Sequence, residues 1–121
     1  MTNPTEAVNA AMTIDGAKAA ALVDLDTGMT LATAGGGIDL ELAGAGNTEV
    51  VRAKMRVMDS TGIEGPIEDI MIVLKDQFHI IHPLTAASGQ GLFLYLALAK
   101  DKANLAMARR QLENIEKSIE I

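Results

Sequence analysis

Two histidines in the segment Phe-His-Ile-Ile-His-Pro have the side chains best suited to metal chemistry in this 121-residue chain. His79 and His82 are three residues apart, and the aliphatic residues around them predict a β-strand. Successive side chains of a strand point to opposite faces, so residues three apart cannot approach the same ion. The chain has no cysteine, and no acidic cluster near the histidines suits zinc. We therefore interpret each histidine as a hydrogen-bonded or edge-exposed residue and expect no metal site.

Other patterns that could support catalysis are incomplete. A Gly-x-Ser-x-Gly nucleophile elbow is missing, and the segment 87–91, Ala-Ser-Gly-Gln-Gly, predicts a flexible loop instead. The glycine run 35–37 is followed by Ile-Asp rather than the Lys-Ser/Thr of a phosphate-binding loop. Asp24 and Asp26 flank a turn, where aspartates commonly cap the backbone. The pair Glu68-Asp69 could raise a carboxylate pKa, but the sequence identifies no partner for it. We conclude that the chain is not an enzyme and expect no cofactor.

Composition favours a protein that binds other proteins. Apolar residues make up 49% of the chain and the mean hydropathy is +0.22, although only three residues are aromatic. A small domain with so many aliphatic residues is expected to cover some of them with another chain. The net charge of −6 and the pI of about 4.7 argue against nucleic acid as a partner, because no basic excess exists to neutralise phosphates.

Targeting segments are not evident. Residues 1–12 lack both the positive region and the apolar stretch of a signal peptide. No run reaches the roughly 18 apolar residues that a transmembrane helix needs. We expect a cytoplasmic protein without direct membrane insertion, which could reach a membrane only through its partners.

The hydrophobic pattern predicts one domain, residues 1–121, of α+β class with the order α-β-β-α-β-β-β-α. The first helix is expected to start at Pro4, with Thr2 or Asn3 as its cap, and to end before Asp15-Gly16. The middle helix is expected over 40–61, although Gly44 and Gly46 leave open a start at Asn47 or Thr48. The remaining predictions are strands over 18–25, 29–34, 67–75, 78–84 and 91–98, and a last helix over 102–119 capped by Asp101.

Two features of these elements bear on how the domain is packed. A three-residue loop is expected between the first two strands, with Gly28 at positive φ. The later strands are apolar at both odd and even positions, as in the run 92–98 of Leu, Phe, Leu, Tyr, Leu, Ala and Leu. Each buried aliphatic side chain contributes about 1.5–3 kcal/mol, so neither face of the sheet is expected to face water. Helices should therefore cover both faces.

The middle helix has an unusually broad apolar surface. At 100° per residue its apolar side chains span an arc of roughly 200°, where a helix on a single core shows about 100° or somewhat more. Two interpretations remain: a core helix of a compact domain, or a helix that packs on the sheet with one side and on a second protein with the other. Flexible methionine side chains favour the second interpretation. The polar arc contains Glu49, Arg52, Arg56, Asp59 and Ser60; the apolar arc contains Val50, Val51, Ala53, Met55, Val57 and Met58.

These segments together resemble the roadblock/dynein light chain family over almost the whole chain, residues 18–119. The first part of the likeness is the segment 20–32, an Ala/Leu/Val strand, an Asp- and Gly-containing turn and a second strand. The later strands follow in the family's order, and Asn104-Leu105 with Ala108-Arg109 resembles the family's Asn-Leu-x-x-Ala-Arg start of the last helix. The resemblance implies a profilin-like fold with a five-stranded antiparallel sheet and helices on both faces.

The resemblance also implies a function. Family members form homodimers or heterodimers in which the strands after the middle helix pair and the middle helices lie side by side. Bacterial members partner small Ras-like GTPases, some of them accelerating GTP hydrolysis, and actinobacterial members occur beside a sensor histidine kinase. This implies a non-enzymatic regulator or scaffold of a GTPase in signal transduction, dimeric with itself or with a paralogue. The expected GTPase contacts are Arg52, Met55, Arg56 and Asp59, and the expected dimer contacts are Val51, Met58, Ile70, Met71, Ile72 and Val73.

Two other functions remain open. A structural adaptor would link proteins without responding to the nucleotide state of a GTPase. A small-molecule sensor would use a pocket between sheet and helix, although few polar or aromatic residues are available to orient a ligand.

Overall fold

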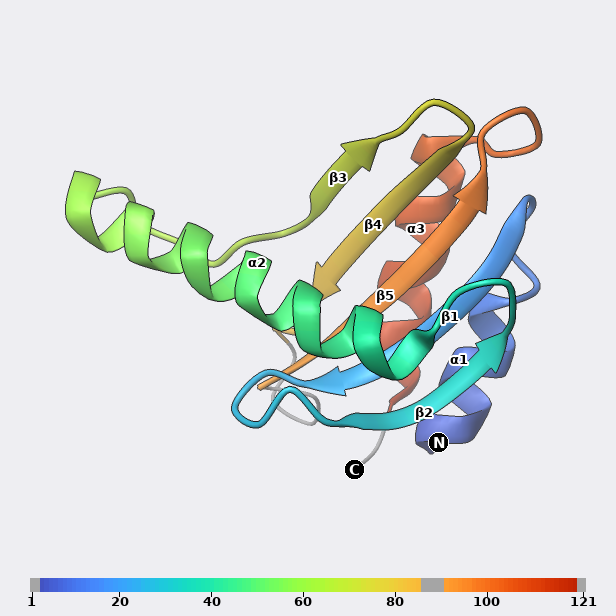
Figure 1. The fold of residues 1–121 in the computed structure, drawn as a ribbon, viewed down its shortest axis with the longest axis horizontal. Helices are drawn as coiled ribbons and strands as arrows, with labels where there is room; N and C mark the ends of the chain where they lie inside the picture. The colour runs from blue at the N-terminus through green and yellow to red at the C-terminus, as the bar shows by residue number, and fades with distance from the viewer. Residues whose placement is uncertain (1–2, 86–90, 120–121) are drawn as a thin grey trace.

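The structure, a computed structural model, describes residues 3–85 and 91–119. In this part of the chain one five-stranded antiparallel sheet has the strand order β2-β1-β5-β4-β3 (Figure 1). The predicted fold class and element order are confirmed. The predicted loop at residues 87–91 falls largely outside the described residues. The elements are α1 (Pro4–Ala11), β1 (Ala17–Asp24), β2 (Thr30–Gly35), α2 (Leu40–Thr61), β3 (Ile70–Val73), β4 (Gln77–Pro83), β5 (Leu92–Ala99) and α3 (Leu105–Ser118).

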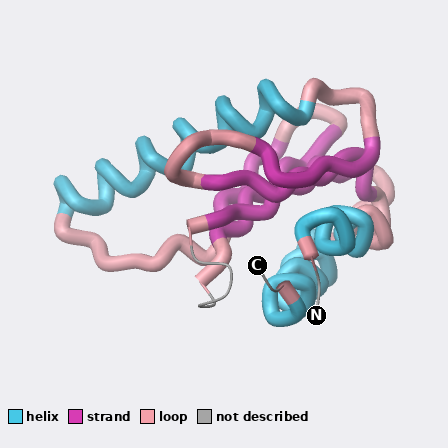
Figure 2. The backbone as a smooth tube through the Cα atoms, turned by 90° about the horizontal axis from the view of Figure 1, so that it is seen from below, coloured by secondary structure: helices cyan, strands magenta, loops and turns pink. Residues whose placement is uncertain are grey.

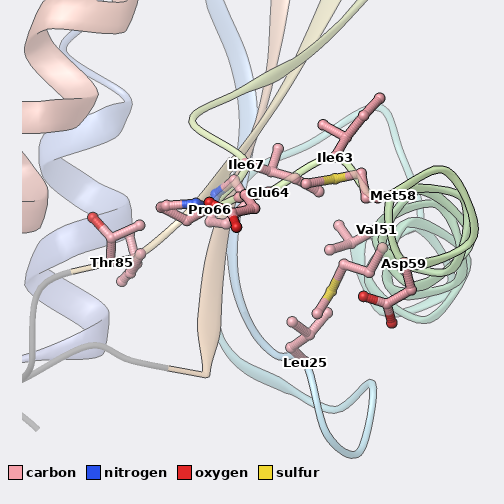
Figure 3. A pocket seen from close by; sticks show the side chains of 14 residues that line it. Leu25, Val51, Met58, Asp59, Ile63, Glu64, Pro66, Ile67 and Thr85 are labelled. Atoms are coloured by element: carbon pink, nitrogen blue, oxygen red, sulfur yellow. The ribbon is translucent and has the colours of Figure 1, made fainter.

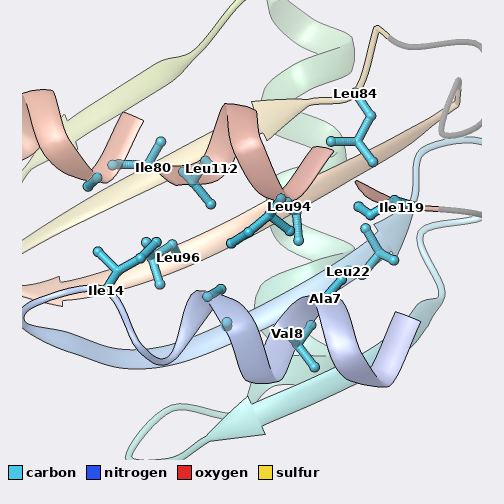
Figure 4. Packing of buried hydrophobic residues seen from close by; sticks show 14 of the residues in the cluster. Ala7, Val8, Ile14, Leu22, Ile80, Leu84, Leu94, Leu96, Leu112 and Ile119 are labelled. Carbon is cyan, nitrogen blue, oxygen red and sulfur yellow. The ribbon is translucent and has the colours of Figure 1, made fainter. Parts of the chain in front are cut away.

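Helices cover both faces of the sheet, as the apolar strands require. Figure 2 shows α2 on one side of the sheet and α1 and α3 on the other. The larger apolar core lies between the sheet and the α1/α3 pair, and Figure 4 shows it from close by. A smaller core lies under α2 and includes Val51, Phe93 and Tyr95.

Alanines in β1 let two helices approach the middle of the sheet. Ala19, Ala20 and Ala21 are fully buried, and they alternate between the two cores. On the α2 side, a Cβ added to Gly44 would lie 3.2 Å from a methyl group of Val23. Gly44 therefore serves close packing of α2 on β1, a gain that offsets its low helix propensity.

The turn between β1 and β2 is one residue longer than predicted. Gly28 has the expected positive φ of 77°, and its N–H donates to the Asp24 carbonyl at 2.7 Å. The Asp24 N–H in turn donates to the carbonyl of Met29, which leaves residues 25–28 in the loop. Further along β2, Leu31 has no partner in the register and forms a bulge opposite Leu22 and Val23.

Three element ends test the predicted caps. Asn3 caps α1, as predicted, with its Oδ1 accepting from the Glu6 N–H at 2.8 Å. The range 40–61 for α2 is confirmed, and Asp39 caps it through Oδ1, so a later start at Asn47 or Thr48 is wrong. The predicted Asp101 cap of α3 is also wrong, because Asn104 accepts from the Met107 N–H at 3.1 Å.

The strand β3 is much shorter than the predicted 67–75. Only Ile70–Val73 pairs with β4, from Ile70 opposite Ile81 to Val73 opposite Phe78. The preceding residues 67–69 run extended along the molecule without a strand partner in the described part of the chain. This strand is the edge of the sheet nearest the far end of α2 (Figure 1).

Candidate protein-binding surface

The strand β3 presents apolar side chains on an open edge of the sheet. It pairs with β4 on one side, and within residues 3–85 and 91–119 no strand pairs with its other side. Val73 is 61% exposed and Met71 is 42% exposed, whereas Ile70 and Ile72 are half-buried. The strand contains no charged residue of the kind that usually protects an exposed edge.

The C-terminal half of α2 extends past the sheet that its N-terminal half covers. The buried residues of the helix are Leu40, Gly44, Thr48 and Val51, all in the first twelve of its 22 residues. Figures 1 and 2 both show the remaining turns projecting beyond the strands. Met55 is 45% exposed there, Val57 is exposed and Met58 is half-buried. The broad apolar arc predicted from the sequence is therefore only partly used within the chain.

Val51 differs from the other residues predicted at the dimer contact. Its side chain is 1% exposed and packs in the core under α2 with Tyr95 and Phe93. The structure thus places Val51 in the chain's own core rather than on an open surface.

A hollow of about 800 Å³ opens between the projecting part of α2 and the end of β4. Its wall is mostly apolar, and Figure 3 shows Val51, Met58 and Ile67 around it. Asp59 and Glu64 supply carboxylates at its margin. The remaining lining includes Leu25, Met55, Ile63, Pro66, Pro83, Leu84 and Thr85.

The two arginines of α2 have different surroundings. The guanidinium of Arg52 donates to the carbonyls of Leu25, at 2.8 Å, and Asp26, and it pairs with Glu49 at 3.1 Å. Arg52 therefore holds the β1–β2 loop against α2, a contact that sequence spacing did not indicate. Arg56, one turn further along, is exposed and makes no hydrogen bond or ion pair with any described residue.

The histidines lie on opposite faces of the sheet, as predicted. His79 packs edge-on against Tyr95 on the α2 face, and its Nδ1 is 3.1 Å from the Tyr95 hydroxyl. Burial, with a smaller effect of Lys18, lowers the pKa of His79 below its usual value. His82 faces α3 on the other side, where its Nε2 is 2.9 Å from Glu116 Oε1. Among the described residues, no group of three His, Cys, Asp or Glu side chains is arranged to hold a metal ion.

His82 belongs to a buried charge cluster that the sequence analysis missed. Its Nδ1 is 2.7 Å from Asp69 Oδ1, and the other oxygen of Asp69 accepts from Arg109 Nε at 2.7 Å. Burial alone would lower the pKa of His82, but the hydrogen bonds to Asp69 and Glu116 raise it above its usual value. Burial alone would raise the pKa of Asp69, but the bonds from His82 and Arg109 lower it. Only the position of Asp69 in an acidic pair was visible in the sequence.

None of the helices in residues 3–85 and 91–119 combines the length and the hydrophobicity that a membrane span requires.

Comparisons with known proteins identify the fold. No protein-family model and no curated protein matches the sequence. Among solved structures, the roadblock/LC7 domain from Streptomyces avermitilis has a TM-score of 0.78 at 14% identity, covering 93% of this chain and 90% of that one. MglB from Myxococcus xanthus has a TM-score of 0.74 at 16% identity, covering 94% and 85%. The gliding protein MglB from Thermus thermophilus has a TM-score of 0.69 at 18% identity, covering 93% and 87%. The chain therefore has the fold of the roadblock/LC7 domain.

Proposed function

We propose that the chain is a non-enzymatic, dimeric regulator or scaffold of a small Ras-like GTPase. The observation that carries the proposal is the joint exposure of β3 and the projecting half of α2 on a roadblock fold. The resemblance to the roadblock family supplies the class of partner, and a solved MglB described as having a tetrameric arrangement supports self-association. We expect the assembly to act in the cytoplasm.

The first step of the proposal is a dimer through β3. Pairing of β3 with the same strand of a second copy, or of a paralogue, supplies hydrogen-bond partners to the open edge and covers Met71 and Val73. The projecting half of α2 then lies over the partner's sheet, where Met58 makes apolar contacts. Ile70 and Ile72, already half-buried in the single chain, complete the contact.

Light scattering tests the dimer directly. The wild type should have twice the 12.7 kDa mass of one chain at micromolar concentration. Val73→Lys should have the mass of one chain, because pairing of β3 would place the new charge against the apolar side chains of the partner strand. The matched control is Thr33→Lys on the opposite edge strand, also exposed, which should stay dimeric. A wild-type monomer, or a dimeric Val73→Lys protein, would contradict the β3 contact.

The second step is docking of the GTPase on the polar ridge of α2. Arg56 and Asp59 are exposed charged groups, and a guanidinium can bind a carboxylate of a partner with two hydrogen bonds. Met55 beside them offers an adaptable apolar contact. Arg52 contributes at the edge of this ridge while it holds the β1–β2 loop.

A pull-down with the GTPase encoded nearest the gene tests the docking. Arg56→Glu should abolish binding and leave the mass in light scattering unchanged. Arg110→Glu, an exposed charge reversal on α3 across the sheet, is the control and should bind normally. Unchanged binding by Arg56→Glu would rule out this ridge as the docking site.

The nucleotide state separates a regulator from a structural adaptor. A regulator should bind the GTP-loaded and GDP-loaded GTPase with different affinity, whereas an adaptor should bind both equally. Single-turnover hydrolysis with and without the chain shows whether hydrolysis is stimulated. Co-purification of a sensor histidine kinase with the complex tests the proposed link to kinase signalling.

The hollow beside α2 favours one other candidate function, a small-molecule sensor. Its volume of about 800 Å³ is large enough for a metabolite, but its wall provides few groups to orient one. A thermal-shift screen that finds a stabilising metabolite would support this role.

A further inference from the structure

The buried cluster around His82 joins three elements that are far apart in the sequence. His82 is in β4, Asp69 lies in the segment that leads into β3, and Glu116 is in the last turn of α3. The imidazole bridges the two carboxylates, at 2.7 Å through Nδ1 and 2.9 Å through Nε2. All three side chains are at least nine-tenths buried. Within residues 3–85 and 91–119 the segment before β3 has no strand partner, so Asp69 attaches it to the rest of the domain through this bridge and through its ion pair with Arg109.

Hydrogen bonding around the cluster requires a proton on each ring nitrogen. Asp69 Oδ2 already accepts from Arg109, and Glu116 Oε2 already accepts from the Thr85 N–H at 2.7 Å. Two contacts remain, from His82 Nδ1 to Asp69 Oδ1 and from His82 Nε2 to Glu116 Oε1, and each needs one proton between its nitrogen and its oxygen. Imidazole is more basic than a carboxylate by about two pKa units, so both protons belong to the ring. The cluster then contains two cations, His82 and Arg109, and two anions.

We infer that His82, as an imidazolium, is a positioning residue that holds the segment before β3 against α3 and so aligns the open edge for a partner strand. The part of this inference that concerns dimerisation rests on the proposed function; the part that concerns the single chain does not. Loss of the ring proton leaves two buried carboxylates facing one neutral ring, with one contact lacking its hydrogen. Residues 67–69 then keep the Arg109 contact of Asp69 but lose the bridge to β4, and β3 loses its alignment.

The inference gives a direction for pH dependence. Because the pKa of His82 is raised on folding, its contribution is complete below the unfolded pKa of 6.5 and is lost as the pH rises through the folded value. Charged groups surround the ring on several sides. Asp69 and Glu116 contact it directly, Arg109 acts through Asp69, and the hollow of about 510 Å³ beside it is also lined by Glu68, Glu113 and Lys117.

Nuclear magnetic resonance of the wild-type protein tests the protonation state. The chain has two histidines, so the ring signals can be assigned from one substitution. His82 should titrate above 6.5 and His79 below it, and His82 should show two protonated nitrogens at pH 6. A midpoint for His82 at or below 6.5 would overturn the inference, whatever the oligomeric state.

Hydrogen exchange tests the positioning role. The protection of amides 70–73, measured relative to amides of the central strand β5, should fall once the pH passes the His82 midpoint, because the pKa of His82 is raised on folding. His82→Gln should show the reduced protection at every pH, whereas His79→Gln on the same strand should keep the wild-type response. Asp69→Asn provides a second variant if His82→Gln does not fold, and it should lower the His82 midpoint. Protection of β3 that does not follow the His82 midpoint would overturn the positioning role.

Dimer affinity measured across the same pH range then separates the proposed β3 dimer from the positioning role of His82. Weakening of the wild-type dimer above the His82 midpoint, absent in His82→Gln, supports positioning of the interface. A dimer with pH-independent affinity contradicts that positioning but leaves the dimer itself standing. A wild-type protein that is monomeric at all pH values refutes the proposed dimer, while the exchange data still decide the role of His82 within the chain.

Discussion

Replacing Arg52 by glutamine should destabilise the fold, although Arg52 lies on the helix face that the sequence assigns to partner binding. The guanidinium donates to the carbonyls of Leu25 and Asp26, which close the β1–β2 loop, and glutamine is too short to reach both. The matched control is Arg56→Gln, one turn further along the helix, where the side chain is exposed.

The magnitude follows from the two hydrogen bonds. A hydrogen bond from a charged donor contributes about 1.5–3 kcal/mol when it is well shielded from water. The Arg52 side chain is 37% exposed, so we expect a combined loss of about 1–2 kcal/mol for the pair of bonds. The ion pair with Glu49 is exposed and adds at most about 0.5 kcal/mol. Arg56→Gln should stay within about 0.5 kcal/mol of the wild type.

Urea unfolding at a fixed chain concentration measures the difference. For Arg52→Gln the urea concentration at the midpoint of unfolding should fall, while the dependence of the unfolding free energy on urea stays unchanged. In a chain of this size the melting temperature should fall by roughly 3–6 °C for each kcal/mol of lost stability. Concentration must be held constant because a dimer is stabilised by mass action. Equal free energies of unfolding for the two variants would refute the loop-holding role. The result also decides which arginine can be used in a docking assay, since a destabilised variant loses binding for an unrelated reason.

Three further predictions concern stability. Asn104→Ala should lower the free energy of unfolding by about 0.5–2 kcal/mol through loss of the α3 cap, whereas Asp101→Ala should leave urea unfolding unchanged. Gly46→Ala should stabilise α2 by about 0.5–1 kcal/mol because its Cβ meets open space. Gly44→Leu should destabilise the protein by at least about 1–3 kcal/mol because the larger side chain overpacks against β1. Thermal melts should show a raised melting temperature for the first variant and a lowered one for the second. The pKa of Asp69 is lowered on folding, so its stabilising effect is complete above its unfolded pKa of 3.8 and is lost as the pH falls through its folded pKa. The difference in unfolding free energy between the wild type and Asp69→Asn should therefore shrink in acid.

Most of the fold could be predicted because local signals agree with one another. The elements and their ends are indicated before any contact is known. The signals are the largely apolar strand runs, Gly28 at the β1–β2 turn and Gly62 after α2. The errors arise where tertiary contacts choose between local alternatives. Asp101 and Asn104 are both good caps, but the turn in which the Lys102 N–H donates to Ala99 moves the helix start to Asn104. The strand β3 begins only at Ile70 although β4 continues past Ile81 to Pro83, and just before it Asp69 bonds to His82 and Arg109, contacts that the residues of β3 do not encode.

The candidate surface could be predicted only in outline. An excess of apolar residues on α2 predicts that some of them are unused within the chain, and Met55 and Val57 are indeed exposed. Single contacts were not predictable, because Arg52 reaches a carbonyl 27 residues away and His82 meets a carboxylate 34 residues away. No periodicity of a helix or strand relates residues at such separations.

The two edges of the sheet limit how many copies can join. If β3 of one copy paired with β2 of the next, each addition would leave a new open edge and the sheet would grow into a filament. Pairing of β3 with the β3 of a second copy uses that edge in both copies and leaves only the two β2 edges open, so growth through β3 stops at two copies. The bulge at Leu31 interrupts the regular spacing of hydrogen-bonding groups along β2, which discourages the growing arrangement. The bulge in β2 thus protects the protein against polymerisation in which the β3 edge of one copy pairs with β2 of the next.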